Sequence, residues 1–423
     1  MKRRDFLNQT ALAGFTALTP RVWGKSFQEN FPPVRAITRG PKSHWFGYYD
    51  KAQVDPTGRY VLGMEVEMPM RSPTGKDILQ IGMVDLKDND RWISLGESNA
   101  WGWQQGCMLQ WRPDSAEEII WNDEQNGQFV CHILNVKTGK QRTLSQAIYT
   151  LSPDGKFAIG TEFNRIQNMR PGYGYPGIAD PYAEIKVPKD IGIYRIDLDS
   201  GESKLLISLA EIAEIPYQGK SVMDSWHYFN HLLISPDSKR FIFLHRWRQE
   251  MGDRAKRATS GFTTRMFTAD IEGKDLHVVD PSGYTSHFIW RDPKHICTWT
   301  KPEGHPHGFY LFEDKTPNFK IVGKDKMTVN GHNTYVPGAD NAWILNDTYP
   351  DKERMQTLYL YNVHEDRKII LGRFYEPPEF KGEWRCDLHP RCNQSGTQVI
   401  FDSTHGGNGR QMYVIDIADI VSV

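Results

Sequence analysis

The stretch that decides the fold is HLLISPDSKRFIFL, residues 231–244. Its two apolar runs flank a Ser-Pro-Asp-Ser turn, which is typical of antiparallel strands joined by a tight connection. Similar hairpins occur at residues 54–64, 111–121, 151–161, 290–299, 335–345 and 392–401. A hairpin that recurs along one chain indicates a repeat architecture, and this pattern takes precedence over a domain count based on length.

A further strand follows each hairpin and ends in a polar residue. These residues are Asp85, Asn135, Asp197, Asp270, Glu313, Asn362 and Asp416. Seven such units predict an all-β chain that forms a seven-bladed β-propeller over residues 41–423. We expect a strand within residues 34–40 to complete the last blade, because the chain stops soon after the seventh unit and would otherwise leave an unpaired edge. Apart from the N-terminus, helical periodicity is nearly confined to residues 207–215.

Residues 1–28 predict an export signal of the twin-arginine type. Arg3 and Arg4 precede an apolar run that is much shorter than the ~20 residues needed to span a bilayer. We therefore expect a periplasmic or secreted protein without a membrane span. An ordinary basic N-terminal helix is the alternative.

The overall composition excludes some classes of protein. The chain has 51 basic and 52 acidic residues and a formal net charge of −1, so it does not resemble a nucleic-acid binder that relies on bulk charge. Its five cysteines are few and odd in number, which argues against a disulfide scaffold. We expect buried thiols instead.

Four histidines share one position in the repeat. When the seven hairpins are aligned on their turns, this position is occupied by Lys51, Met108, Ile148, His231, His287, His332 and His389. The first strand of a blade starts on the face where its second strand ends, so the four imidazoles should surround one mouth of the central channel. The alternative is four separate core histidines, each bonded to nearby backbone.

Imidazoles next to a carboxylate are common ligands of divalent metal ions. We predict a metal site made of His287, His332, His389 and Asp387. The metal would be a divalent ion such as manganese or zinc, with calcium also possible. Arg246 on the same rim is a predicted catalytic residue. The predicted substrate-binding residues of the same rim are Tyr335, Arg385, His405 and Arg410.

Three segments resemble the oligogalacturonate lyase family, whose members are seven-bladed propellers that cleave pectic uronides with a divalent metal, often manganese. The resemblance therefore implies manganese as the metal. NHLLISPD (230–237) resembles the family segment that carries a proposed base, which implies that His231 is the catalytic base, and TSHFIWRD (285–292) resembles the family's SHF ligand segment. DLHPRCNQSGTQVIFDS (387–403) resembles the last blade with its HPHPSF ligand pair. The chain departs from the family where Asp387 replaces a histidine and Trp384 replaces a glutamine ligand, and it lacks a clear counterpart of the family's catalytic arginine.

The predicted function is therefore the metal-dependent cleavage of acidic oligosaccharides by β-elimination. This reaction removes a weakly acidic hydrogen beside a carboxylate, so it needs a base and a positive charge that stabilises the developing enolate. A non-catalytic TolB-like propeller is one alternative. A glycoside hydrolase is another, and it would use Asp347 and Asp402 as its pair of carboxylates.

Overall fold

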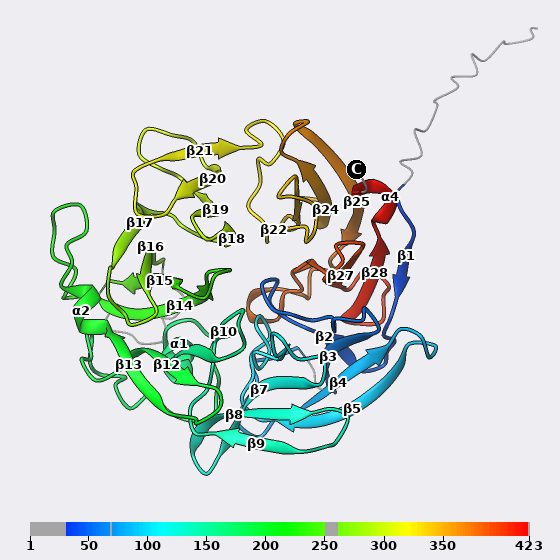
Figure 1. Cartoon of the computed structure of the whole chain (residues 1–423), viewed down its shortest axis with the longest axis horizontal. Helices are drawn as coiled ribbons and strands as arrows, with labels where there is room; N and C mark the ends of the chain where they lie inside the picture. Colours follow the sequence, from blue (N-terminus) through cyan, green and yellow to red (C-terminus); the bar gives the residue numbers. More distant parts are fainter. Residues whose placement is uncertain (1–30, 68–69, 250–260, 422–423) are drawn as a thin grey trace, which may run out of the picture. The chain divides into compact units, whose positions relative to one another are not determined.

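The computed structural model describes residues 31–67, 70–249 and 261–421, and these residues form seven four-stranded antiparallel sheets. The sheets follow one another around a ring, with the first strand of each blade nearest the centre (Figure 1). This arrangement confirms the predicted all-β fold and the seven-bladed β-propeller. The predicted export signal lies outside the described residues.

The first four blades come from residues 43–283. Blade 1 contains β2 (Ser43–Trp45), β3 (Tyr60–Val66), β4 (Leu79–Asp85) and β5 (Arg91–Ser98). Blade 2 contains β6 (Gln110–Trp111), β7 (Glu118–Gln125), β8 (Gln128–Asn135) and β9 (Gln141–Leu144). Blade 3 contains β10 (Thr150–Leu151), β11 (Phe157–Thr161), β12 (Gly192–Asp197) and β13 (Ser203–Ser208). Blade 4 contains β14 (Trp226–Ile234), β15 (Arg240–Arg248), β16 (Thr263–Asp270) and β17 (His277–Gly283).

The last three blades complete the ring. Blade 5 contains β18 (Phe288–Asp292), β19 (His295–Thr300), β20 (Gly308–Glu313) and β21 (Phe319–Val322). Blade 6 contains β22 (Thr334–Tyr335), β23 (Trp343–Asn346), β24 (Met355–Asn362) and β25 (Arg367–Tyr375). Blade 7 contains β26 (Arg391–Cys392), β27 (Gln398–Ser403), β28 (Gln411–Asp416) and, from the other end of the chain, β1 (Val34–Ala36).

The strand expected to close the last blade does so. β1 pairs antiparallel with β28, with Arg35 opposite Val414, and the Ile37 N–H donates to the Met412 carbonyl at 2.9 Å. The outer edge of β28 is therefore covered by a strand from the beginning of the propeller.

The polar residue at the end of each third strand has a structural role. The Asp197 carboxylate accepts the Ser200 N–H at 2.8 Å, and the Asp270 carboxylate accepts the Lys274 N–H at 2.8 Å. A side chain that accepts backbone N–H groups a few residues ahead stabilises a tight turn. The recurring residue at this position therefore starts the connection to the fourth strand.

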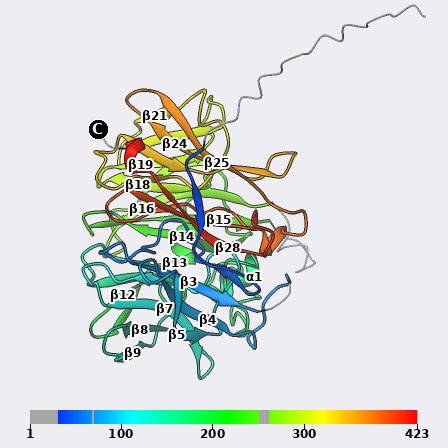
Figure 2. The same ribbon diagram turned by 90° about the vertical axis from the view of Figure 1, so that its right-hand side faces the viewer.

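The described helices are short. They are α1 (Phe163–Met169), α2 (Leu209–Ala213), the 3₁₀ helix η1 (Gly382–Trp384) and α4 (Ala418–Val421). α2 lies in the segment where helical periodicity was expected, whereas α1 was not predicted. α1 and α4 lie on opposite sides of the ring (Figure 2). None of the described helices has the length and apolar character needed to cross a bilayer.

The five cysteines are free thiols, and four of them are buried. Burial raises the pKa of Cys386, which favours its neutral form. Cys392 is only partly buried. The prediction of buried thiols is confirmed for the other four.

Candidate metal and substrate site

A local backbone feature aims His231 at the centre of the ring. The pairing of β14 with β15 shifts register between Asn230 and Leu232, and His231 between them has a φ of 50°. His389 adopts a similar left-handed conformation, with a φ of 42°. A bulge of this kind turns a side chain away from its regular direction along the strand.

Residues 46–51, between β2 and β3, occupy the centre of the ring, and we call them the central segment. Tyr48 and Tyr49 are both nearly fully buried, and their rings contact those of His231 and His332. The Tyr49 hydroxyl donates to the Phe288 carbonyl at 2.9 Å and accepts the Phe288 N–H at 3.0 Å. The central segment thus connects blade 1 to blades 4, 5 and 6.

Three of the four predicted metal ligands form a compact group. One ligand atom from each of His332, Asp387 and His389 lies within 4.8 Å of the others, and all three residues are buried. Asp387 Oδ1 and His389 Nε2 are buried without a hydrogen-bond partner within the described part of the chain. Buried polar atoms rarely remain unpaired, so this donor set fits a bound cation. We call these residues the three-ligand group.

Asp347 orients two members of the three-ligand group. Its carboxylate accepts the backbone N–H of His332 at 2.6 Å and that of His389 at 3.2 Å. It also accepts Nδ1–H of His332 at 3.0 Å, which leaves the lone pair of Nε2 free for a metal. A carboxylate behind a histidine is the usual arrangement around metal-binding imidazoles.

His287 lies beside the three-ligand group and is not part of it. Its ring centroid is 4.1 Å from that of His332, and its Nδ1–H donates to Asn330 Oδ1 at 3.1 Å. Because Nδ1 carries the proton, Nε2 keeps its lone pair. The Tyr349 hydroxyl is 3.5 Å from Nε2. Burial and the neighbouring His332 lower the pKa of His287 well below its ordinary value, so the ring is neutral.

His231 is directed away from open space. It is 1% exposed, stacks on Phe288 with ring centroids 4.0 Å apart, and donates from Nε2 to Asp50 at 3.0 Å. Burial lowers the pKa of His231 to about 4. Burial alone would raise the pKa of Asp50, but Lys51 and His231 bring it down to about 2. Sequence analysis did not identify Asp50 as a partner of His231.

Arg385 links the three-ligand group to the loop after α1. Its Nε donates to Asp387 at 2.9 Å, and a terminal nitrogen donates to the Tyr173 hydroxyl at 2.6 Å. Burial opposes a charge on Arg385, but Asp387 and Tyr173 outweigh it and raise its pKa. Tyr173 is likewise buried, yet Arg170 and Arg385 lower its pKa below the ordinary value. Arg385 is therefore held in its charged form.

A cavity of about 270 Å³ opens beside the three-ligand group. It is lined by Tyr48, Arg170, Arg246, Phe262, Thr264, Gly283, Tyr284, Thr285, Ser286, His287, Trp299, Asn330 and Tyr349. We call it the arginine cavity. Predicted residues His287 and Arg246 face it, whereas Arg170 was missed because it follows the unpredicted helix α1 and belongs to no repeat.

None of the four predicted substrate-binding residues lines the arginine cavity. Arg385 instead donates to Asp387 and Tyr173, as described above. Tyr335 packs against the core cluster that includes Cys297 and Ile344. The His405 ring packs between those of Phe374 and Tyr413, with ring centroids 4.8 and 4.3 Å away.

Arg410 is 3% exposed and donates to backbone carbonyls, including that of Arg385 at 2.9 Å. It therefore supports the loop that carries Arg385, and its guanidinium group does not face the arginine cavity.

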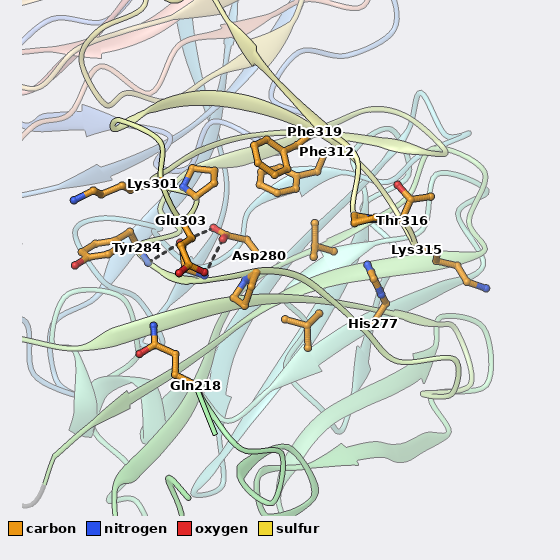
Figure 3. Close-up of a pocket in the computed structure, with 17 residues that line it drawn as sticks. Gln218, His277, Asp280, Tyr284, Lys301, Glu303, Phe312, Lys315, Thr316 and Phe319 are labelled. Carbon is orange, nitrogen blue, oxygen red and sulfur yellow. Dashed lines mark hydrogen bonds between the residues drawn. The ribbon is translucent and has the colours of Figure 1, made fainter. Parts of the chain in front are cut away.

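A larger cavity, about 1010 Å³, lies elsewhere, between blades 4 and 5 (Figure 3). Figure 3 shows Phe312 and Phe319 side by side at one edge and Asp280 near the middle. The Asp280 carboxylate accepts hydrogen bonds from the hydroxyls of Ser282, at 3.1 Å, and Thr285, at 2.5 Å. Because this carboxylate is already paired and the shared histidines are absent from the lining, we place the candidate site in the smaller cavity.

Comparison with known proteins identifies the fold. No family model and no curated protein sequence matches the chain. Among solved structures, oligogalacturonate lyase from Vibrio parahaemolyticus is similar, with a TM-score of 0.64 and 12% identity over 92% of this chain and 95% of that one. An oligogalacturonate lyase in complex with manganese has a TM-score of 0.63 and 14% identity over 91% and 93% of the two chains.

A prolyl endopeptidase is also similar, with a TM-score of 0.51 and 12% identity over 91% of this chain and 49% of that one. At such identities the likeness concerns the fold, and the same architecture carries unrelated activities. The chain therefore shares the propeller fold of oligogalacturonate lyases over most of its length.

Proposed function

We propose that this protein is a divalent-metal-dependent lyase that cleaves uronic-acid-containing oligosaccharides by β-elimination. The observation that carries the proposal is the three-ligand group. Its buried ligand atoms of Asp387 and His389 have no hydrogen-bond partner among the described residues, and they lie next to a cavity lined by arginines. Three protein ligands also leave coordination positions open, as catalytic metal sites do.

His332, Asp387 and His389 would hold the ion. A divalent cation bound there supplies positive charge that stabilises the negative charge developing beside the substrate carboxylate. Two imidazoles in the ligand set disfavour calcium, which prefers oxygen ligands. We propose manganese, as in the similar lyase that was solved with this metal, with zinc as the alternative.

We assign the proton acceptor to His287 in place of His231. A base must lie within hydrogen-bond reach of the substrate, and His287 lines the arginine cavity whereas His231 does not. The hydrogen bond from His287 Nδ1–H to Asn330 leaves the lone pair of Nε2 to accept the proton. His231 instead holds Asp50 and thereby the central segment.

The glycoside hydrolase alternative is disfavoured by the carboxylates that it would need. Asp347 accepts backbone N–H groups and the His332 ring, as described above. Asp402 accepts the Gly47 N–H at 3.2 Å and an Arg391 guanidinium N–H at 3.1 Å. Both groups are buried structural acceptors, so neither is placed as an acid or a nucleophile in an open site.

The proposal is tested by incubating the protein with a panel of uronic-acid oligosaccharides and recording the ultraviolet absorbance of the unsaturated product. We expect product formation that stops after chelation and returns on adding manganese. Cleavage without an unsaturated product, or activity that chelation leaves intact, would contradict the proposal. The His389→Ala variant should lose both bound metal and activity.

A further inference from the structure

Two arginines face the arginine cavity and form no ion pair with an acidic side chain in the described part of the chain. Arg246 is 5% exposed, and within the described residues its only side-chain hydrogen bond runs from Nε to the Thr264 hydroxyl at 3.2 Å. The partly buried Arg170 makes no side-chain hydrogen bond to any other described residue. Terminal guanidinium nitrogens of both side chains are therefore available to the cavity.

Aromatic rings hold these two cations in place. The guanidinium carbons of Arg170 and Arg246 lie 5.0 and 4.8 Å from the centre of the Phe262 ring. Arg170 also stacks on Tyr173 at 3.9 Å. Stacking on aromatic faces stabilises a guanidinium group but leaves its N–H donors in the ring plane free.

The surroundings of Arg246 oppose its charge. Burial lowers the pKa of Arg246, and the charge of Arg170 lowers it further. Burial and Arg385 also oppose the charge of Arg170, but Tyr173 and Tyr228 outweigh them and raise its pKa. Because like charges in a poorly solvated place destabilise the fold, a compensating anion is expected when the site is in use.

We propose that Arg170 and Arg246 form an anion-binding subsite that takes the carboxylate of a second uronic acid residue, next to the sugar at the three-ligand group. Paired guanidinium donors suit a planar carboxylate, which accepts two hydrogen bonds side by side. The identity of the ligand as a uronide rests on the proposed function, whereas the affinity for a small oxyanion does not.

The subsite is separate from the three-ligand group, yet adjoins it. Tyr48 lines the arginine cavity, and its ring is 5.3 Å from that of His389. Tyr349 lines the same cavity, and its ring is 5.8 Å from that of His332. A substrate that spans both places needs an acidic group at each end, so the site should prefer oligosaccharides with two adjacent uronic acids.

The experiment uses inorganic sulfate as a probe of the subsite in the full chain, after chelation of metals and at constant ionic strength. Arg170→Gln and Arg246→Gln are compared with Arg373→Gln, which removes an exposed arginine that pairs with Asp351 on the surface. We expect sulfate to raise the melting temperature of the wild type and of Arg373→Gln along a saturable curve. The two cavity variants should bind sulfate about tenfold more weakly or not at all.

A second readout separates ligand binding from a structural role. In the absence of sulfate, Arg246→Gln should melt at the same temperature as the wild type or higher, because it removes a buried charge that lies next to the charge of Arg170. A clear loss of stability would show that Arg246 supports the fold and would overturn the proposal. A sulfate response equal to that of the wild type in both cavity variants would overturn it as well.

The ligand class is tested with a disaccharide of two uronic acids and with its counterpart in which the second carboxylate is a methyl ester. The free acid should compete with sulfate at least tenfold better than the ester, and Arg170→Gln should abolish this difference. If sulfate binds to the pair but the free acid does not compete, the carboxylate assignment is overturned. If the protein cleaves uronides but Arg170→Gln and Arg246→Gln bind sulfate as well as Arg373→Gln does, the proposed lyase function stands and the anion-binding subsite is ruled out.

Discussion

An imidazole uses one ring nitrogen for an oriented hydrogen bond, and this bond decides which nitrogen remains available for chemistry. Asp347 takes Nδ1–H of His332, and Asn330 takes Nδ1–H of His287, so both rings keep an Nε2 lone pair. His231 differs because Asp50 takes Nε2–H. The three histidines share a repeat position, but their partners give them different roles.

The roles of His287 and His332 can be separated by measuring metal content and activity in the same samples. We expect His287→Ala to lose elimination by about 100-fold or more while it keeps its metal, because the three-ligand group is complete without this ring. His332→Ala should lose both. If His287→Ala loses its metal, then His287 is a ligand, as the sequence analysis predicted.

His231 should make the stability of the fold depend on pH. Its pKa is about 4 in the folded protein and about 6.5 in an unfolded chain, so between these values the unfolded state binds more protons. Stability is therefore fully present above pH ~6.5 and is lost as the pH falls towards ~4.

His231→Gln should flatten this dependence, which urea unfolding measured at several pH values between ~4 and ~7 would reveal. The exposed residue His305 provides a control, since His305→Gln should leave the slope unchanged. An unchanged slope in His231→Gln would contradict the buried, neutral state of this histidine.

At the scale of elements, the repeated parts and the short helix α2 were predictable, whereas the other inserted parts were not. The hairpins and the shared histidine position have a period, so they could be read from sequence. The central segment and α1 each occur once in the chain. Because neither is repeated, the sequence pattern did not indicate that Tyr48 enters the channel or that Arg170 faces the arginine cavity. The prediction that Tyr335 lies on the rim with His332 was wrong. Tyr335 follows His332 by three residues, and an odd separation along an extended chain puts the two side chains on opposite faces.

The central segment should contribute to stability through Tyr49. Its hydroxyl satisfies both the N–H and the carbonyl of the buried residue Phe288. Tyr49→Phe removes both bonds while it keeps the ring, and we expect the free energy of unfolding to fall by about 1–3 kcal/mol. Tyr375→Phe, at a side chain that is 44% exposed, is the matched control and should change it little. An equal effect of both substitutions would show that the central segment is not held by this hydroxyl.

At the scale of the whole molecule, the functional groups come from blades far apart in sequence. Tyr48 precedes β3, Arg170 follows α1, and Asp387 precedes β26. They meet only when the ring is closed, because each blade contacts mainly its neighbours. The integrity of the site therefore depends on the closure of the ring by β1.

Closure by β1 is tested by truncation. Removing residues 1–37 deletes β1 and also Ile37, which is 1% exposed and donates to Met412. We expect the apparent free energy of unfolding to fall by about 2–5 kcal/mol, because a buried isoleucine and the pairing with β28 are both lost. The uncovered edge of β28 should also promote self-association, measurable by light scattering. Removing residues 1–31 keeps β1 and serves as the control, so equal behaviour of the two truncated chains would rule out a role for β1 in holding the ring together.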